Sequence, residues 1–157
     1  MEVQSAIHVP RAIHRGEEEL PFVDFAEGVK VQLLQVDIPL GLWVVRTRFA
    51  PGTTIPTHKH TGPVYAFTLT GQWKYLEYPE VNTAGSYLYE PAGSIHTLTV
   101  PPDTVGITDV WFAIYGANLN LDEGGNVSSV VDAGFIRDYY FSMCEMNGLG
   151  RPQVVGA

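Results

Sequence analysis

The sequence predicts an all-β fold: a single-domain β-barrel with a jelly-roll-like double sheet, an N-terminal arm and a C-terminal helix. Three observations predict it. The chain has 157 residues, which suits one domain with its own core. Its middle contains short segments rich in β-branched and aromatic residues, which favour strands. Its 16 glycines and 11 prolines supply the turns that many short strands require.

The elements follow one another along the chain. Residues 1–28 are mixed in character and are expected to form the arm, in which the acidic run 17–19 is a solvated turn. The barrel is expected over residues 29–131, where turns containing glycine and proline separate the strands. The predicted strands cover residues 29–36, 42–49, 64–70, 72–78, 85–90, 96–100 and 107–115. The stretch DEGGNV at 122–127 is a turn that joins NLNL and VSSV into a final short hairpin.

The hydrophobic period changes after residue 131, so residues 132–157 are expected to form a helix and a tail. Asp132 can cap a helix that runs to about Asn147, and Gly148 is a natural terminator. The apolar stripe predicted for this helix consists of Phe135, Tyr139, Met143 and Met146.

Composition excludes several classes of protein. Lys plus Arg number 9 against 17 Asp plus Glu, a net charge of -8, so a nucleic-acid partner is not expected. A single cysteine, Cys144, excludes an internal disulfide and is expected to be a small buried hydrophobe on the helix. The N-terminal residues lack an apolar signal-peptide core, and no apolar run is long enough to cross a bilayer. The expected location is therefore the cytoplasm, without a membrane partner.

The segment that indicates chemistry contains His58 and His60. Residues two apart in a strand point to the same face, so both imidazoles can reach one point. His96 is the third candidate metal ligand. Three neutral imidazoles suit Fe, Zn, Cu or Ni, and nitrogen ligands alone do not choose among them. Three protein ligands also leave open coordination positions, which is typical of a catalytic metal rather than a structural one.

The residues around these histidines resemble the two motifs of the cupin family, small β-barrels with a metal in the interior. The first motif, G-x5-H-x-H-x3-E-x6-G, reads here as Gly52, His58, His60, Val64 and Gly71. The second, G-x5-P-x-G-x2-H-x3-N, reads as Gly85, Pro91, Gly93, His96 and Val100. The two departures are Val64 in place of the glutamate and Val100 in place of the asparagine.

The departure at Val64 has a physical consequence. Without the carboxylate the site is more positive by one charge, which favours a substrate that arrives as an anion, such as an enolate. If Val64 points inward, so do Ala66, Thr68 and Thr70, and small residues there leave room over a metal. The opposite side of this strand is apolar too, so we expect it to be covered by the arm or by another subunit of a homodimer or higher homo-oligomer. The aromatic candidates for the substrate pocket are Tyr65, Tyr75, Trp43 and Trp111, for which packing in the core is the alternative.

A more specific resemblance concerns HKHTGPVYAFTLTGQWKYLEY and GSYLYEPAGSIHTL. These runs resemble the dihydroxyacetophenone dioxygenase group of cupins, to which the acetylacetone-cleaving dioxygenase is similar. The resemblance implies Fe(II) bound by His58, His60 and His96, with Glu90 as a catalytic residue near the metal. It also implies O2-dependent cleavage of the C–C bond next to a carbonyl, in a hydroxyketone or diketone bound as its enolate.

Alternatives remain open from the residues alone. Glu90 also fits a glutamate at the rim of the barrel, and the metal can be Zn, Mn, Ni or Cu. The same ligands suit a non-catalytic cupin that senses a metal or a small molecule, or a Zn or Mn isomerase or hydrolase. His8, His14 and Lys59 are predicted to be surface residues.

Overall fold

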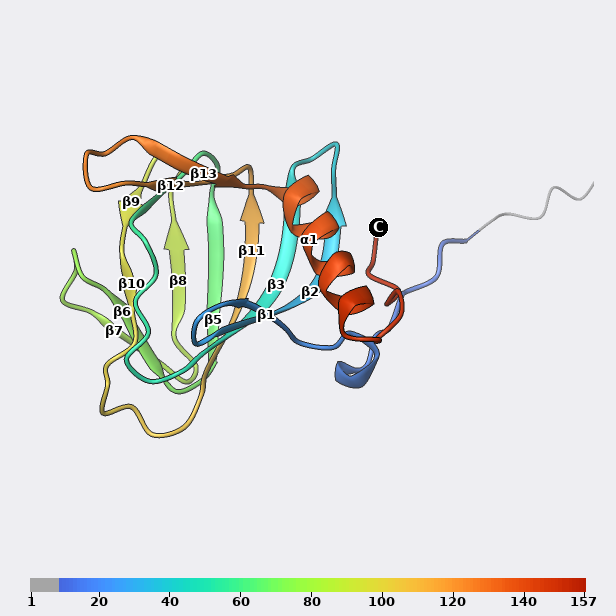
Figure 1. The fold of residues 1–157 in the computed structure, drawn as a ribbon, viewed down its shortest axis with the longest axis horizontal. Helices are drawn as coiled ribbons and strands as arrows, with labels where there is room; N and C mark the ends of the chain where they lie inside the picture. The colour runs from blue at the N-terminus through green and yellow to red at the C-terminus, as the bar shows by residue number, and fades with distance from the viewer. Residues whose placement is uncertain (1–8) are drawn as a thin grey trace, which may run out of the picture.

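A six-stranded antiparallel sheet forms one wall of the molecule. The computed structural model describes residues 9–157, and Figure 1 shows this sheet with α1 against one end of it. Its strand order is β1-β2-β3-β11-β5-β8. The strands are β1 (Val23–Ala26), β2 (Val29–Asp37), β3 (Leu42–Phe49), β11 (Thr108–Tyr115), β5 (Val64–Thr70) and β8 (Tyr87–Glu90).

Two smaller sheets complete the barrel. One has the order β13-β12-β4-β9 and the other β10-β6-β7. Their strands are β13 (Val127–Val131), β12 (Asn118–Leu121), β4 (His58–His60), β9 (Ile95–His96), β10 (Leu98–Thr99), β6 (Gln72–Tyr75) and β7 (Val81–Thr83). Side chains from all three sheets line one interior cavity. The prediction of an all-β barrel with a C-terminal helix is confirmed.

Differences from the predicted elements occur at their ends. The predicted segment 96–100 is divided between β9 and β10, and 72–78 ends as a strand at Tyr75. The predicted arm contains the 3-10 helix η1 (Glu17–Glu19) and β1, which pairs with β2. The final hairpin is confirmed as β12 and β13. The three-part division of the chain stays a prediction.

The C-terminal helix α1 (Ala133–Met146) begins as predicted but buries a different face. The Asp132 carboxylate accepts a hydrogen bond of 2.8 Å from the Phe135 backbone N–H. The predicted stripe is wrong, because Phe135 and Met146 are 46% and 79% exposed. The buried residues are Ala133, Ile136, Tyr140, Phe141 and Cys144. This face is selected because α1 packs on β1 and β2. The Tyr140 hydroxyl also donates to the carbonyl of Pro21, just before β1.

Alternation along β5 sets what lies inside the barrel. Val64, Ala66 and Thr68 are buried, whereas Phe67 and Leu69 are exposed on the outer side. The prediction was wrong for Thr70, which is exposed because it lies at the end of the strand. Lys59 and His14 are exposed and Cys144 is buried, as predicted, and His8 lies outside the described residues. Within residues 9–157, no helix combines the length and the apolar character that crossing a membrane requires.

Candidate metal centre

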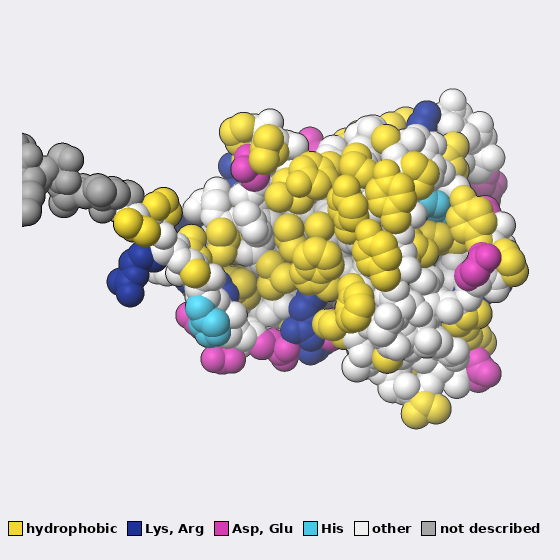
Figure 2. Space-filling model, turned by 180° about the vertical axis from the view of Figure 1, so that it is seen from behind, with side chains coloured by type: hydrophobic (Ala, Val, Ile, Leu, Met, Phe, Trp, Pro, Cys, Tyr) yellow, Lys and Arg dark blue, Asp and Glu magenta, His cyan; other side chains and the backbone are white. Residues whose placement is uncertain are grey.

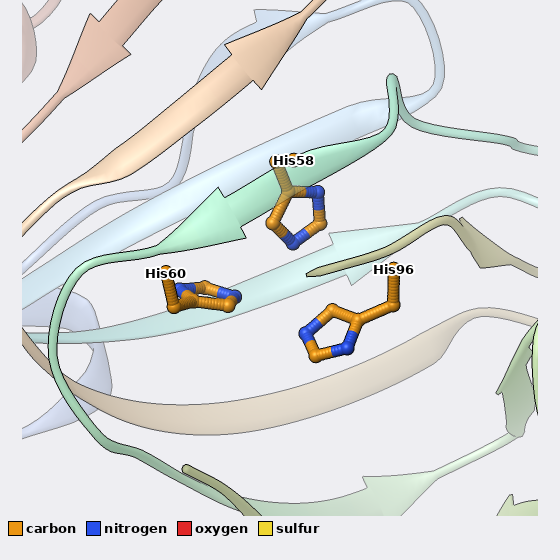
Figure 3. Close-up of side chains that lie close together, drawn as sticks. All are labelled: His58, His60 and His96. Atoms are coloured by element: carbon orange, nitrogen blue, oxygen red, sulfur yellow. The ribbon is translucent and has the colours of Figure 1, made fainter. Parts of the chain in front are cut away.

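Two paired strands bring the three histidines together. His58 and His60 lie on β4, and His96 on β9 is the direct cross-strand neighbour of His58. All three side chains are buried, and Figure 3 shows the rings turned toward a common space. One ligand nitrogen from each lies within 4.8 Å of the others. The alternation of β4, which exposes Lys59 between two buried histidines, is what places both imidazoles on the inner side.

His58 is prepared to act as a neutral ligand. Its Nδ1 lies 2.9 Å from the Pro56 carbonyl oxygen, and because a carbonyl only accepts, this nitrogen carries the proton. The Nε2 lone pair is therefore free for a metal. Burial lowers the pKa of His58 to about 4, with the neighbouring His60 and His96 adding to the effect. The imidazole is neutral at neutral pH, the state that metal binding requires.

Glu90 supplies a buried carboxylate to the histidines from the strand next to Val64. The Cα partner of Val64 across β5 and β8 is Glu90 itself. Its Oε2 atom lies 2.8 Å from His60 Nε2 and 3.2 Å from His96 Nε2. Burial alone would raise the pKa of Glu90, but the two adjacent rings outweigh it and lower the pKa to about 2. The acid missing from β5 is thus replaced by one on the adjacent strand.

Tyr75, on β6, fixes the position of this carboxylate. Its hydroxyl donates a hydrogen bond to Glu90 Oε1. Its ring stacks on His96, with centroids 3.9 Å apart and planes inclined by 15°. Tyr75 was expected only as an aromatic wall, and the sequence carries no signal for the hydroxyl contact. The contact arises because β6 pairs with β10, in which Leu98, two residues after His96, is the cross-strand partner of Tyr75.

The arrangement fits a bound metal ion. Both ring nitrogens of His96 are buried without a hydrogen-bond partner, and so is Glu90 Oε2, whose short contacts lack hydrogen-bond geometry. Buried polar atoms without partners are costly, and a cation held by His58, His60 and His96 would take one of the two His96 nitrogens as a ligand and offset the charge of Glu90. Three imidazoles with a neighbouring carboxylate suit Fe, Zn, Mn or Ni.

A mostly apolar cavity of about 160 Å³ adjoins the histidines. Of the predicted pocket residues, Val64, Trp43 and Tyr75 line it, whereas Ala66 and Thr68 are buried and do not line it. Thr68 instead accepts a hydrogen bond from the Trp73 indole N–H.

Tyr65 and Trp111, which were also predicted for the pocket, do not line this cavity. Tyr65 is the cross-strand partner of Tyr89 on β8, and Trp111 is the partner of Phe67 on β5. Because Tyr89 and Phe67 face outward, their partners also point away from the cavity. Wall residues not predicted include Phe25 from β1, Ile136 from α1, and Asn118 from β12. Asn118 pairs with His60 across β12 and β4, and its side-chain oxygen is buried without a partner.

Comparison with known proteins places the chain in a family. Residues 11–110, well over half of the chain, match the family described as the ChrR cupin-like domain. The chain belongs to this cupin family. The expected membership in the cupin superfamily is therefore confirmed. A comparison with curated proteins found no match to this sequence.

Solved structures share the fold over most of the chain. A protein of unknown function with a cupin-like fold from Ralstonia eutropha JMP134 is 36% identical, with a TM-score of 0.88 over 97% of this chain and 96% of its own. An acetylacetone dioxygenase from Acinetobacter johnsonii is 19% identical, with a TM-score of 0.76 over 91% of this chain and 99% of its own. The anti-sigma factor ChrR of Rhodobacter sphaeroides, solved with SigE, is 16% identical, with a TM-score of 0.51 over 59% of this chain and 47% of its own. The last two likenesses concern the fold alone.

Proposed function

We propose that this cupin is a non-haem Fe(II)-dependent dioxygenase that cleaves the C–C bond next to a carbonyl in a hydroxyketone or diketone. The observation that carries the proposal is the set of three buried histidines at an apolar cavity, with an ionised carboxylate beside them. Iron bound by three imidazoles would supply a Lewis acid and a meeting point for the ketone and O2. The fold shared with an acetylacetone dioxygenase agrees with this reaction.

The cavity favours a neutral, apolar group on the substrate. Among the lining residues described, none is a lysine or an arginine, so a second anionic group on the substrate would find no partner. A volume of about 160 Å³ suits one ring, since an apolar cavity of about 150 Å³ holds benzene. The unpartnered Asn118 oxygen can accept a hydrogen bond from a substrate hydroxyl. An aryl hydroxyketone satisfies each of these features.

Glu90 is the group suited to accept a proton from the substrate. With the Tyr75 hydroxyl on Oε1, the other carboxylate oxygen, Oε2, faces the histidines. Its lowered pKa keeps it ionised at neutral pH. A pKa this low also makes the carboxylate a weak base, so Oε2 would take the proton only from a ketone made more acidic by a bound metal. Val64 and Trp43 form part of the dry wall that strengthens this interaction.

The test uses purified protein loaded anaerobically with Fe(II), then exposed to O2 with a dihydroxyacetophenone-like ketone or a β-diketone. We expect one O2 consumed for each ketone cleaved, which gives two acids from the hydroxyketone and one acid plus a 2-oxoaldehyde from the β-diketone. His96→Ala should abolish the reaction, and Glu90→Gln should lower kcat by about 10²–10⁴-fold. Lys59→Gln is the matched control, because Lys59 lies between two ligands on β4 but is exposed. Iron-loaded protein that binds ketones but consumes no O2 would contradict the proposal.

The second candidate is a non-catalytic cupin that senses a metal or small molecule. It is favoured by the match to the ChrR cupin-like family, because ChrR is an anti-sigma factor. Metal and ketone binding without turnover would support this candidate. Product formation under anaerobic conditions would instead indicate a Zn or Mn isomerase or hydrolase.

A further inference from the structure

The outer side of the six-stranded sheet is covered over only one part of its width. Residues 17–22 lie over β2 and β3, where the Gln32 amide N–H2 donates to the carbonyls of Leu20 and Glu17 at 2.6 and 3.1 Å. The Arg48 guanidinium lies 3.9 Å from the centre of the Phe22 ring in the same region. The described part of the arm therefore covers β2 and β3, and these contacts do not extend to β5 and β8.

The other part of this side is apolar and open. Phe67, Tyr87 and Tyr89 are 42%, 64% and 53% exposed. Strand pairing places Trp111, Phe67 and Tyr87 in one row across β11, β5 and β8. Figure 2 shows this surface, which we call the aromatic face, as a broad yellow area on the side hidden in Figure 1. Large contiguous apolar areas of this kind mark interaction sites.

The aromatic face carries no charge at its centre. The side chains that β5 and β8 direct outward are Tyr65, Phe67, Leu69, Tyr87 and Tyr89. The nearest charged group on β11, Asp109, is already paired with Arg46 and Arg48 at 2.6 and 2.9 Å. Two copies of a chain with a net charge of -8 repel each other. This electrostatic repulsion is smallest when the two copies meet through surfaces that carry no charge.

The exposed area suits a partner of protein size. An aromatic side chain offers about 200 Å², so Phe67, Tyr87 and Tyr89 together expose roughly 320 Å². A standard interface takes about 800 Å² from each partner, with an apolar centre and a polar rim. The three rings thus supply about two-fifths of that area before Leu69, Trp111 and the rim are added.

We propose that the aromatic face binds a second copy of this chain, sheet against sheet, in a two-fold symmetric dimer. In a two-fold symmetric dimer both subunits contribute the same patch. The aromatic face of one copy would therefore pack against the aromatic face of the other, and the interface would need no complementary charge. When two sheets pack face to face, their side chains interdigitate and the sheets lie about 10 Å apart. Because these side chains point away from the histidines, the proposal stands independently of the chemistry proposed above.

The test is sedimentation velocity on the full chain across a concentration series. The wild type should sediment at twice the 17.3 kDa mass of one chain. Phe67→Glu and, separately, Tyr87→Glu place like charges opposite each other across the axis, and each should raise the dimer dissociation constant by about 100-fold or more. Higher salt should partly restore the dimer of either variant by screening. Val105→Glu makes a similar change at a residue that is 95% exposed outside the face, and it should leave the dimer intact.

Two results would overturn the proposal. One is a wild type that stays monomeric at every concentration, which would leave the face to a different protein or to no partner. The other is a Tyr87→Glu variant that retains the wild-type dissociation constant. Circular dichroism and the metal stoichiometry of each variant verify that it is folded, and Tyr87, the most exposed of the three rings, carries the test if Phe67→Glu fails to fold.

Discussion

Tyr75→Phe removes one hydroxyl from the metal centre and leaves the aromatic stack in place. In metal-free protein the hydroxyl is the hydrogen-bond donor to Glu90 Oε1. Tyr75 and Glu90 are 3% and 2% exposed, so bulk solvent contributes little in place of the lost bond. The ring can still stack on His96. The change therefore isolates a single contact to a buried, ionised carboxylate.

The expected cost follows from that burial. Leaving a buried acceptor unpaired costs about 1–3 kcal/mol, and an ionised one lies toward the upper end, so we expect a loss of about 2–3 kcal/mol. For a chain of 157 residues this corresponds to a decrease in Tm of roughly 6–9 °C. Urea and thermal unfolding of metal-free protein measure it. Tyr78→Phe is the control, because Tyr78 is 47% exposed and its hydroxyl is free to bond with water.

A double-mutant cycle identifies the partner of the hydroxyl. In a Glu90→Gln background the acceptor is neutral, so Tyr75→Phe should cost clearly less than in the wild type. The reasoning is refuted if Tyr75→Phe stays within about 0.5 kcal/mol of the wild type, a change typical of unconstrained surface sites. It is also refuted if the cost is the same in both backgrounds.

Two further predictions concern charge at the metal centre. Val64→Glu places a second carboxylate opposite Glu90, so metal-free protein should lose about 3 kcal/mol or more, and Fe(II) should recover part of it. Val64→Gln is the uncharged control, and equal losses in metal-free protein would contradict the role of charge. The second prediction concerns pH. Because unfolded His58 binds a proton below about 6.5 and the folded imidazole only below about 4, the unfolded state binds more protons between these values. Metal-free protein should therefore lose about 3 kcal/mol as the pH falls through this window, and a His58→Gln variant with the same slope in urea titrations would exclude His58 as the cause.

Sequence patterns predicted what depends on local spacing. The interval between His58 and His60 predicted a shared face, and the Asp132 cap predicted where α1 begins. The same alternation rule that placed Val64 inward places Tyr65 outward, so the sequence already contained the reason why Tyr65 misses the cavity. Trp111 faces outward because of its register with Phe67, which its own strand does not reveal.

What the sequence did not predict depends on pairing between distant strands. Glu90 was a candidate through resemblance, but its position opposite Val64 follows from the register of β5 and β8. The Tyr75 hydroxyl and the unpartnered Asn118 oxygen reach the site through the β6–β10 and β12–β4 pairs. The buried face of α1 depends on the surfaces of β1 and β2, which helical periodicity alone does not determine.

The position of the carboxylate on β8 instead of β5 determines which parts of the site move together. A glutamate at residue 64 would share a chain segment with His58 and His60, whereas Glu90 is joined to the strand of His96 by the short loop 91–94. That loop is held to β4 by two backbone hydrogen bonds with His60, from Gly93 N–H at 2.7 Å and to the Ser94 carbonyl at 3.1 Å. Loosening these two bonds would displace the acid and the third imidazole as one unit, and would leave the histidine pair on β4 in place.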